Sequence, residues 1–184
     1  MNDIPVREHL QSKAEIQAAL RAAVGGVADW ISAQPDAQFE YAPEGRWTMG
    51  QHLEHLVRSI KPLTSALRAP KFVLKLVLAK PRRKGMSYVE VRTRYEGVLD
   101  EGGKASGKFL PPPVTLSRKA ELLKALRKEG DNLARQLDGW SEADLDAVGA
   151  KHPLIGLMSL RELLFFTVHH HDHHLNTLQR DYAG

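Results

Sequence analysis

The sequence predicts an all-α fold: a four-helix bundle with a long crossover between its second and third helices. Four segments carry apolar residues at three- and four-residue steps, the spacing of one helix face. Three of them begin with a capping box, in which a hydroxyl caps the N3 amide and a Glu or Gln reaches back; the boxes are Ser12 to Glu15, Thr48 to Gln51 and Ser159 to Glu162. Helices that are polar on one side must pack together to bury their apolar faces.

The first two helices are defined by their caps and by proline. The first is expected to follow Ser12 and to stop before Pro35. The second is expected to run from Thr48 to about Pro70, and Pro62 should kink it or end its regular part. Both carry an apolar stripe, formed in the first by Ile16, Leu20, Val24, Val27 and Ile31 and in the second by Met49, Leu53, Leu56, Ile60, Leu63 and Leu67.

The last two helices lie in the second half of the chain. The third is expected from about Thr115 to Leu137, and Gly139 behind it suits a left-handed cap. The fourth begins at Ser159 and continues nearly to the end of the sequence. A chain of 184 residues with 42% hydrophobic content is long enough for one substantial core, so a single domain over residues 1–184 is expected.

The connection from Pro70 to Pro113 is too long for a tight turn between antiparallel helices. Within it, SYVEVRTRYEGV (87–98) alternates enough to permit a short hairpin, and GKFLPPP (107–113) is expected to be stiff and extended. The apolar run KFVLKLVLAK (71–80) is interpreted first as a buried part of the crossover, then as a dimer contact or a membrane-surface patch. The crossover either covers one end of the bundle as a lid or simply joins its helices.

Composition excludes several classes of protein. The longest apolar run, Phe72 to Ala79, is far shorter than the roughly 20 residues that cross a bilayer, so no membrane partner is expected. The net charge of +4 is concentrated in the cluster Lys80 to Gly85, which lacks interleaved aromatic residues, so nucleic acid is not an expected partner. The first residues lack the features of a secretory signal, and we expect a cytoplasmic protein.

The chain contains no cysteine, which limits its metal and thiol chemistry. A bound metal would have to be held by His, Asp or Glu. Any thiol that takes part in a reaction would have to come from outside the chain.

Five histidines fall within HHHDHH, residues 169–174, on the fourth helix. At about 100° per residue, His170 and His174 lie about 40° apart in the middle of the buried stripe, whereas His169 and His173 lie on a more polar flank. Two neutral imidazoles one turn apart can share a divalent cation, which removes the cost of burying their unpaired nitrogens. The alternatives are hydrogen-bonded core histidines or a tag remnant; an interrupting aspartate and the capped helix before the run argue against a tag.

A third ligand has to come from another helix. The second helix offers His52 and His55, which both border its apolar face beside small polar residues. Helical geometry alone slightly favours His52, which lies closer to the centre of that face.

Two stretches resemble motifs of the DinB-like, or YfiT-like, superfamily of metal-dependent enzymes. RWTMGQHLEHLVRS (46–59) is similar to the start of that family's second helix, which has a Trp, a Ser or Thr, and a His eight residues after the Trp; this selects His55. KHPLIGLMSLRELLFFTVHHHDHHLNTL (151–178) is similar to the family's last helix, in which one His follows another after four residues; this selects His170 and His174. The resemblance therefore implies these three histidines as metal ligands.

The remaining histidines surround this set. His52, His171 and His173 are then neighbours of the ligands or alternative ligands. The chain departs from the family at Gln51, where Glu is common, and its additional histidines, His169 among them, leave room for a shifted ligand register.

The resemblance also implies a function. Proteins of this family are bundles, often dimeric, in which three histidines hold a divalent metal, commonly nickel or zinc, that stays open to water. Characterised relatives include S-transferases that use a low-molecular-weight thiol. The most specific expectation is therefore a homodimeric, thiol-dependent S-transferase with a small-molecule substrate, in which the metal favours the thiolate form of the thiol. The alternatives are a metal-dependent hydrolase and a non-catalytic bundle stabilised by metal.

The sequence assigns no catalytic residue besides these ligands. Glu54 points away from the expected pocket on its helix, and His152 is a candidate base only because it shortly precedes the fourth helix. An anionic thiol would be steered by the basic cluster of Lys80, Arg82, Arg83 and Lys84.

Overall fold

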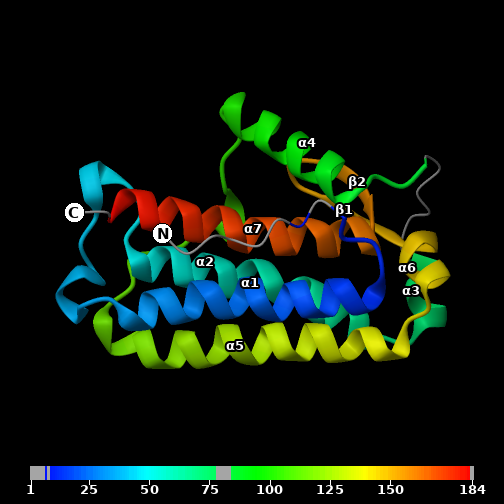
Figure 1. Ribbon diagram of the computed structural model, residues 1–184, viewed down its shortest axis with the longest axis horizontal. Helices are drawn as coiled ribbons and strands as arrows, with labels where there is room; N and C mark the ends of the chain where they lie inside the picture. Colours follow the sequence, from blue (N-terminus) through cyan, green and yellow to red (C-terminus); the bar gives the residue numbers. More distant parts are fainter. Residues whose placement is uncertain (1–6, 8, 78–83, 183–184) are drawn as a thin grey trace.

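The computed structural model describes residue 7, residues 9–77 and residues 84–182. Four long helices lie lengthwise beside one another (Figure 1): α1 (Lys13–Ala33), α2 (Met49–Arg68), α5 (Lys119–Gln136) and α7 (Leu160–Asp181). The structure confirms the predicted all-α four-helix bundle with a long crossover between the second and third of these helices.

The order of the helices around the bundle explains the crossover. Helices α1 and α2 each pack against both α5 and α7. The colour gradient in Figure 1 shows that α1 and α7 run in one direction and that α2 and α5 run in the other. Because α2 and α5 are parallel neighbours, the chain must travel back along the bundle between them, and a short turn cannot connect them.

The predicted helix starts are confirmed at all three capping boxes. Ser12, Thr48 and Ser159 each accept a hydrogen bond from the N3 amide, and each N3 side chain bonds back to the cap amide. These bonds satisfy backbone amides that have no partner inside the helix. They set the residues at which α2 and α7 begin, and this fixes the position of each side chain along the helix axis.

The predicted extent of the second helix, from Thr48 to about Pro70, is confirmed, whereas one predicted helix cap differs in the structure. Of the two effects expected of Pro62, an end to the regular helix does not occur: α2 continues to Arg68, because Thr64 and Leu67 beyond the proline are buried and hold the last turns against the bundle. Gly139 does not form a left-handed cap and is absent from the positive-φ residues of the described chain. Instead α5 tightens into a 3-10 turn, η5 (Leu137–Gly139), in which the Trp140 amide donates to the Leu137 carbonyl.

The crossover contains two helices, α3 (Lys71–Val77) and α4 (Tyr88–Asp100), where a hairpin was expected over 87–98. The hairpin prediction is wrong because Ser87 and Glu90 form a fourth capping box. Tyr88, Val91 and Tyr95 then fall on one buried helix face, which packs along α7 (Figure 1).

The rest of the crossover has mixed burial. Phe72 on α3 is 74% exposed, whereas Leu74 is buried, so this part of the apolar run is only partly buried. Residues 78–80, the last of the apolar run 71–80, lie outside the described residues. GKFLPPP begins with a 3-10 turn, η3 (Gly107–Phe109), and is extended after it, and η4 (Leu116–Arg118) leads into α5.

A short antiparallel hairpin precedes α7 and was not predicted. Strand β1 (Gly149–His152) pairs with β2 (Gly156–Ser159), with His152 opposite Gly156. Gly156 has a φ of 90°, which explains a glycine at the return of this turn. The remaining short elements are α6 (Glu142–Ala147), η1 (Asp36–Gln38) and η2 (Pro43–Gly45).

Buried apolar side chains from all four long helices form one continuous cluster. It includes Leu20, Leu53, Leu126 and Leu164, one from each helix, all of which are fully buried. None of the helices within 9–77 and 84–182 combines the length and the apolar character needed to pass through a bilayer.

Candidate metal centre

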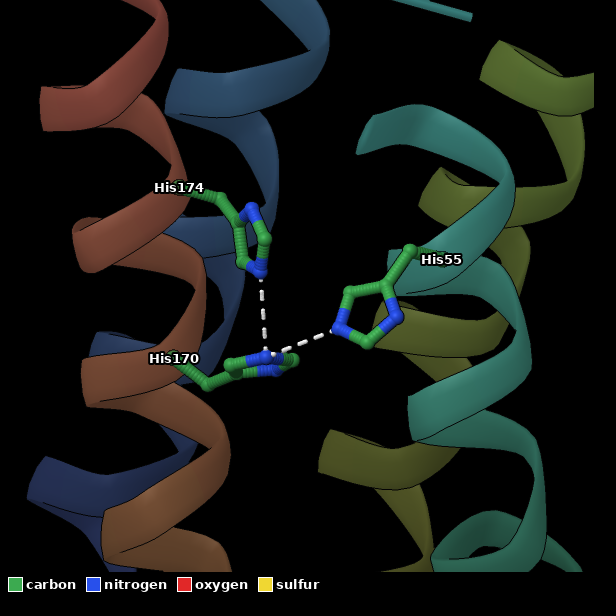
Figure 2. Close-up of side chains that lie close together, drawn as sticks. All are labelled: His55, His170 and His174. Carbon is green, nitrogen blue, oxygen red and sulfur yellow. Dashed lines mark hydrogen bonds between the residues drawn. The ribbon is translucent and has the colours of Figure 1, made fainter. Parts of the chain in front are cut away.

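Three buried histidines from two neighbouring helices meet inside the bundle (Figure 2). His55 projects from α2, and His170 and His174 project from successive turns of α7. The Nε2 atom of His170 lies 3.1 Å from Nε2 of His55 and 3.1 Å from Nε2 of His174. One ligand atom from each residue lies within 4.8 Å of the other two.

Hydrogen bonding fixes the protonation of His55. Its Nδ1 atom lies 2.7 Å from the carbonyl oxygen of Phe109 in the crossover. A carbonyl only accepts, so Nδ1 carries the proton and Nε2 presents a lone pair to His170. The Nε2 atom of His170 faces Nε2 of both His55 and His174, and a single N–H can be directed at only one of them. A cation satisfies this arrangement better than hydrogen bonds among the rings do.

Burial keeps all three rings neutral at pH 7. It lowers the pKa of His55 below the usual 6.5, and it takes the pKa of His170 and His174 well below that value. The charges of neighbouring histidines lower the pKa of His170 and His174 further. Neutral imidazole is the form that binds a metal, so the ligand set needs no deprotonation near neutral pH.

The spacing of the nitrogens fits a single divalent ion. A histidine nitrogen binds zinc at about 2.0–2.1 Å, so two such nitrogens on one ion are roughly 3.0–3.4 Å apart. The two separations of 3.1 Å fall within this range. The ligand atoms of His55 and His174 also lie within 4.8 Å of each other, so the three histidines could hold one metal ion after adjustment of their rings.

His52 lies behind His174 and is not part of the cluster. Its Nδ1 atom is 2.7 Å from Nδ1 of His174, the ring nitrogen opposite the one that faces His170. Burial, with a contribution from His55, lowers the pKa of His52 to about 4. His52 can thus orient the ring of His174, as partners of metal-binding histidines commonly do.

The other three histidines of the run face different surroundings. His171 is fully buried and its Nδ1 donates to the Thr167 carbonyl one turn earlier. Nε2 of His169 lies 3.5 Å from a carboxylate oxygen of Glu96 on α4. His173 borders the cavity described below, with its ring 5.8 Å from that of Tyr95.

Aromatic rings enclose the cluster on two sides. Trp47, just before α2, stacks on His174 with an interplanar angle of 7° and also packs against His55. Phe166 stacks on His170 from the preceding turn of α7, with ring centroids 5.0 Å apart. These rings restrict the rotamers of the histidines and limit the access of water.

A partly open cavity of about 520 Å³ reaches the cluster. Its walls come from α2, α4, the crossover around Phe109, the β1–β2 hairpin and α7, and all three clustered histidines border it. Apolar side chains predominate, and the charged residues among its described lining are Lys104 and Lys151; no described lining residue is acidic. The three histidines therefore face a space large enough for a small molecule.

Glu54 cannot act in this cavity, because it is held on another side of α2. It is buried, and its carboxylate pairs with Arg58 at 2.6 Å and with Arg118 at 3.1 Å. Arg58 also donates to the carbonyls of Lys108 and Leu110, on either side of Phe109. This network anchors the crossover beside His55.

A model of the DinB superfamily matches residues 16–178, which is most of the chain. The chain belongs to the DinB superfamily. Among solved structures, YfiT from Bacillus subtilis resembles it with a TM-score of 0.56 and 18% sequence identity, covering 98% of this chain and 91% of that one. YfiT is described as "a probable metal-dependent hydrolase with an unusual four-helix bundle topology". At this identity the likeness shows a shared fold. No curated protein matches the chain.

In this DinB-superfamily protein the structure brings together the three histidines that the family motifs select, and His52 lies outside the set. Sequence reasoning missed Tyr95 and the Phe109 carbonyl, and it gave His152 no defined geometry. Of these residues, only Tyr95 could have been anticipated from the sequence, because the capping box at Ser87 predicts the helix that carries it. The steering residues Lys80, Arg82 and Arg83 lie outside the described residues, and Lys84 is exposed and absent from the cavity lining.

Proposed function

We propose that this protein is a metal-dependent enzyme in which His55, His170 and His174 hold one divalent cation, nickel or zinc. The observation that carries the proposal is the convergence of three neutral, buried Nε2 atoms at the inner end of an open cavity. Three protein ligands leave a coordination position for a substrate, which is typical of catalytic rather than structural zinc.

The reaction we propose is the transfer of an external low-molecular-weight thiol to an electrophile, as in an S-transferase. A divalent cation held by these histidines would favour the thiolate over the thiol and so would supply a nucleophile at neutral pH. A carbon–sulfur bond forms, the bond from carbon to its leaving group breaks, and the leaving group departs with the proton of the thiol. The absence of cysteine and of acidic residues from the described cavity lining supports an external nucleophile.

The second candidate is metal-dependent hydrolysis. The description of YfiT as a probable metal-dependent hydrolase favours it, as does His173, a neutral imidazole at the cavity whose pKa is lowered by burial. Hydrolysis would need a base for water. Glu54 is held in ion pairs and no described lining residue is acidic, which leaves His173 as the candidate base.

One experiment separates these candidates. The full-length protein is loaded with nickel or zinc and mixed with a chlorodinitrobenzene or an epoxide and, in turn, bacillithiol, mycothiol and glutathione. We expect metal-dependent consumption of the electrophile with at least one thiol and none in His55→Ala. Metal-dependent cleavage of p-nitrophenyl acetate without any thiol effect would favour hydrolysis. No metal-dependent turnover of either kind would indicate a non-catalytic bundle.

Homodimerisation remains a prediction of the family resemblance. Light scattering after gel filtration would give a mass near twice 20.6 kDa for a dimer. A monomeric mass would contradict it.

A further inference from the structure

His152, on the β1–β2 hairpin, presents an unused hydrogen-bond donor at the cavity. The backbone amides of Leu154 and Ile155 both lie within hydrogen-bonding distance of its Nδ1 atom, at 3.3 and 3.2 Å. Amides only donate, so Nδ1 is the acceptor and the proton of the neutral ring sits on Nε2. Burial lowers the pKa of His152 to about 4, so the ring is neutral at pH 7. Its turn thus makes His152 a donor, which argues against the role of base.

The position of His152 relates it to the three-histidine cluster. Its ring packs on Phe166 with centroids 4.2 Å apart, and Phe166 in turn stacks on His170. His152 and His170 both border the cavity. Within the described residues Nε2 of His152 has no hydrogen-bond partner, so its proton remains for a molecule in the cavity.

The charges around the cavity have one sign. Lys104, from the loop after α4, and Lys151, beside His152, are exposed residues of the lining, and neither forms an ion pair within the described part of the chain. With no acidic lining residue among those described, their field attracts anions into a space that is otherwise mainly apolar.

We propose that the cavity selects a small molecule with an apolar body and an anionic group, and that Nε2–H of His152 binds this anion while Lys104 and Lys151 draw it in. The apolar body lies against side chains such as Leu99, Leu163 and Phe166. The claim that such a molecule is the substrate rests on the proposed function, whereas the selectivity for anions does not. His152 is then a substrate-binding residue.

A pair of fluorescent dyes tests this selectivity. 1-Anilinonaphthalene-8-sulfonate and N-phenyl-1-naphthylamine share an aromatic body, and only the first carries an anion. Both are titrated into the full-length protein, metal-free and nickel-loaded. We expect the anionic dye to bind at least about tenfold more tightly, because a hydrogen bond to a charged group contributes about 1.5–3 kcal/mol. Equal affinities for the two dyes would overturn the proposal.

Variants at His152 distinguish the role of its Nδ1 atom in the turn from the role of its Nε2–H in binding the anion. In His152→Asn the amide oxygen can replace Nδ1 as the acceptor of the turn, but nothing replaces Nε2–H. We expect a loss of about tenfold in affinity for the anionic dye and no change for the neutral one. In His152→Gln the side-chain amide reaches the Nε2 position and should preserve selectivity. Equal losses for both dyes in both variants would mean that His152 only supports the hairpin.

The lysines are tested against a matched pair. Lys104→Ala with Lys151→Ala should weaken binding of the anionic dye by about two- to thirtyfold, since exposed charge pairs are each worth about 0.2–1 kcal/mol. Lys124→Ala with Lys128→Ala, two exposed lysines of α5 outside the lining, should leave both dyes unchanged. An equal loss of affinity for the anionic dye in the control pair would show that the effect comes from net charge alone, which would contradict the proposal.

Two further measurements keep this inference apart from the proposed function. Ala66→Trp adds a large side chain to the wall that α2 contributes to the cavity, and it should weaken the binding of both dyes. Unchanged affinity for both would mean that they bind elsewhere and would overturn the inference. Metal uptake is measured on the same samples. Dye selectivity without metal uptake would refute the proposed function alone, and metal uptake without dye selectivity would refute this inference alone.

Discussion

The Nδ1 atom of His55 lies 2.7 Å from the carbonyl oxygen of Phe109, so the crossover fixes the orientation of a histidine on α2. This bond leaves Nε2 of His55 as a lone pair aimed at His170. The long connection that the parallel arrangement of α2 and α5 requires is thus also part of the candidate metal centre.

Arg58→Ala tests whether the anchoring of the crossover matters for metal binding. Arg58 binds the carbonyls on either side of Phe109, so its loss should loosen the partner of His55. We expect nickel or zinc affinity to fall about tenfold, as for other residues that orient metal ligands, in a competitive titration. Arg127→Ala is the control, because Arg127 pairs with Asp29 on the bundle surface. Equal affinities in the two variants would show that the crossover does not position His55.

His52→Phe and His55→Phe distinguish a supporting residue from a ligand. His52 contacts the ring nitrogen of His174 that faces away from the cluster, so its loss should weaken metal binding about tenfold or more without changing the stoichiometry. His55→Phe should reduce the stoichiometry itself. Calorimetry measures both quantities. The reverse pattern would make His52 the third ligand.

A buried ion pair ties the start of the chain to α7. Arg7 and Asp172 lie 3.3 Å apart with side chains that are 7% and 8% exposed, and Arg7 also donates to the Ala19 carbonyl. Burial raises the pKa of Asp172 to about 6, although Arg7 opposes this. Arg7→Ala should therefore lower the free energy of unfolding by about 3 kcal/mol, because it leaves a buried carboxylate unpaired.

The double variant Arg7→Ala with Asp172→Asn provides the check on this prediction. A neutral amide needs no counter-charge, so most of the lost stability should return in urea unfolding. A double variant as unstable as Arg7→Ala would show that the arginine acts through packing.

Two glycines in the long helices should respond to alanine in opposite directions. A Cβ on Gly130 of α5 would lie 2.8 Å from a methyl group of Val24, whereas one on Gly25 of α1 would meet nothing within 4 Å. We expect Gly130→Ala to cost about 1–2 kcal/mol by overpacking. Gly25→Ala should add about 0.5–1 kcal/mol by helix propensity. Urea unfolding midpoints compare the two, and changes of the same sign would contradict the close packing of α1 on α5.

The long helices were predictable because their signals are local. Capping boxes and apolar spacing lie within a few residues of one another, and Ser12, Thr48 and Ser159 cap helices as expected. The hairpin expected at 87–98 failed because its alternation is weak beside the capping box at Ser87 and the apolar contacts of α4 with α7. The prediction of a left-handed cap at Gly139 was wrong because a 3-10 turn ends α5 without a left-handed residue.

The candidate site was predictable only in part. His170 and His174 lie one turn apart on the same face of one helix, so their spacing alone brings them together. The helical wheel slightly favoured His52, but the structure brings His55 to the cluster. The choice depends on how α2 rotates against α7 and on the Phe109 carbonyl, 54 residues away in sequence. No local pattern specifies a backbone acceptor in a distant loop.

The most direct test of the metal centre is the metal content of the untagged protein, measured by mass spectrometry after dialysis against nickel or zinc. The cluster predicts about one ion per chain in the wild type and almost none in His170→Ala with His174→Ala, because His55 alone cannot hold a divalent cation. Circular dichroism should show that the double variant keeps its helices. One ion per chain in the folded double variant would contradict the account.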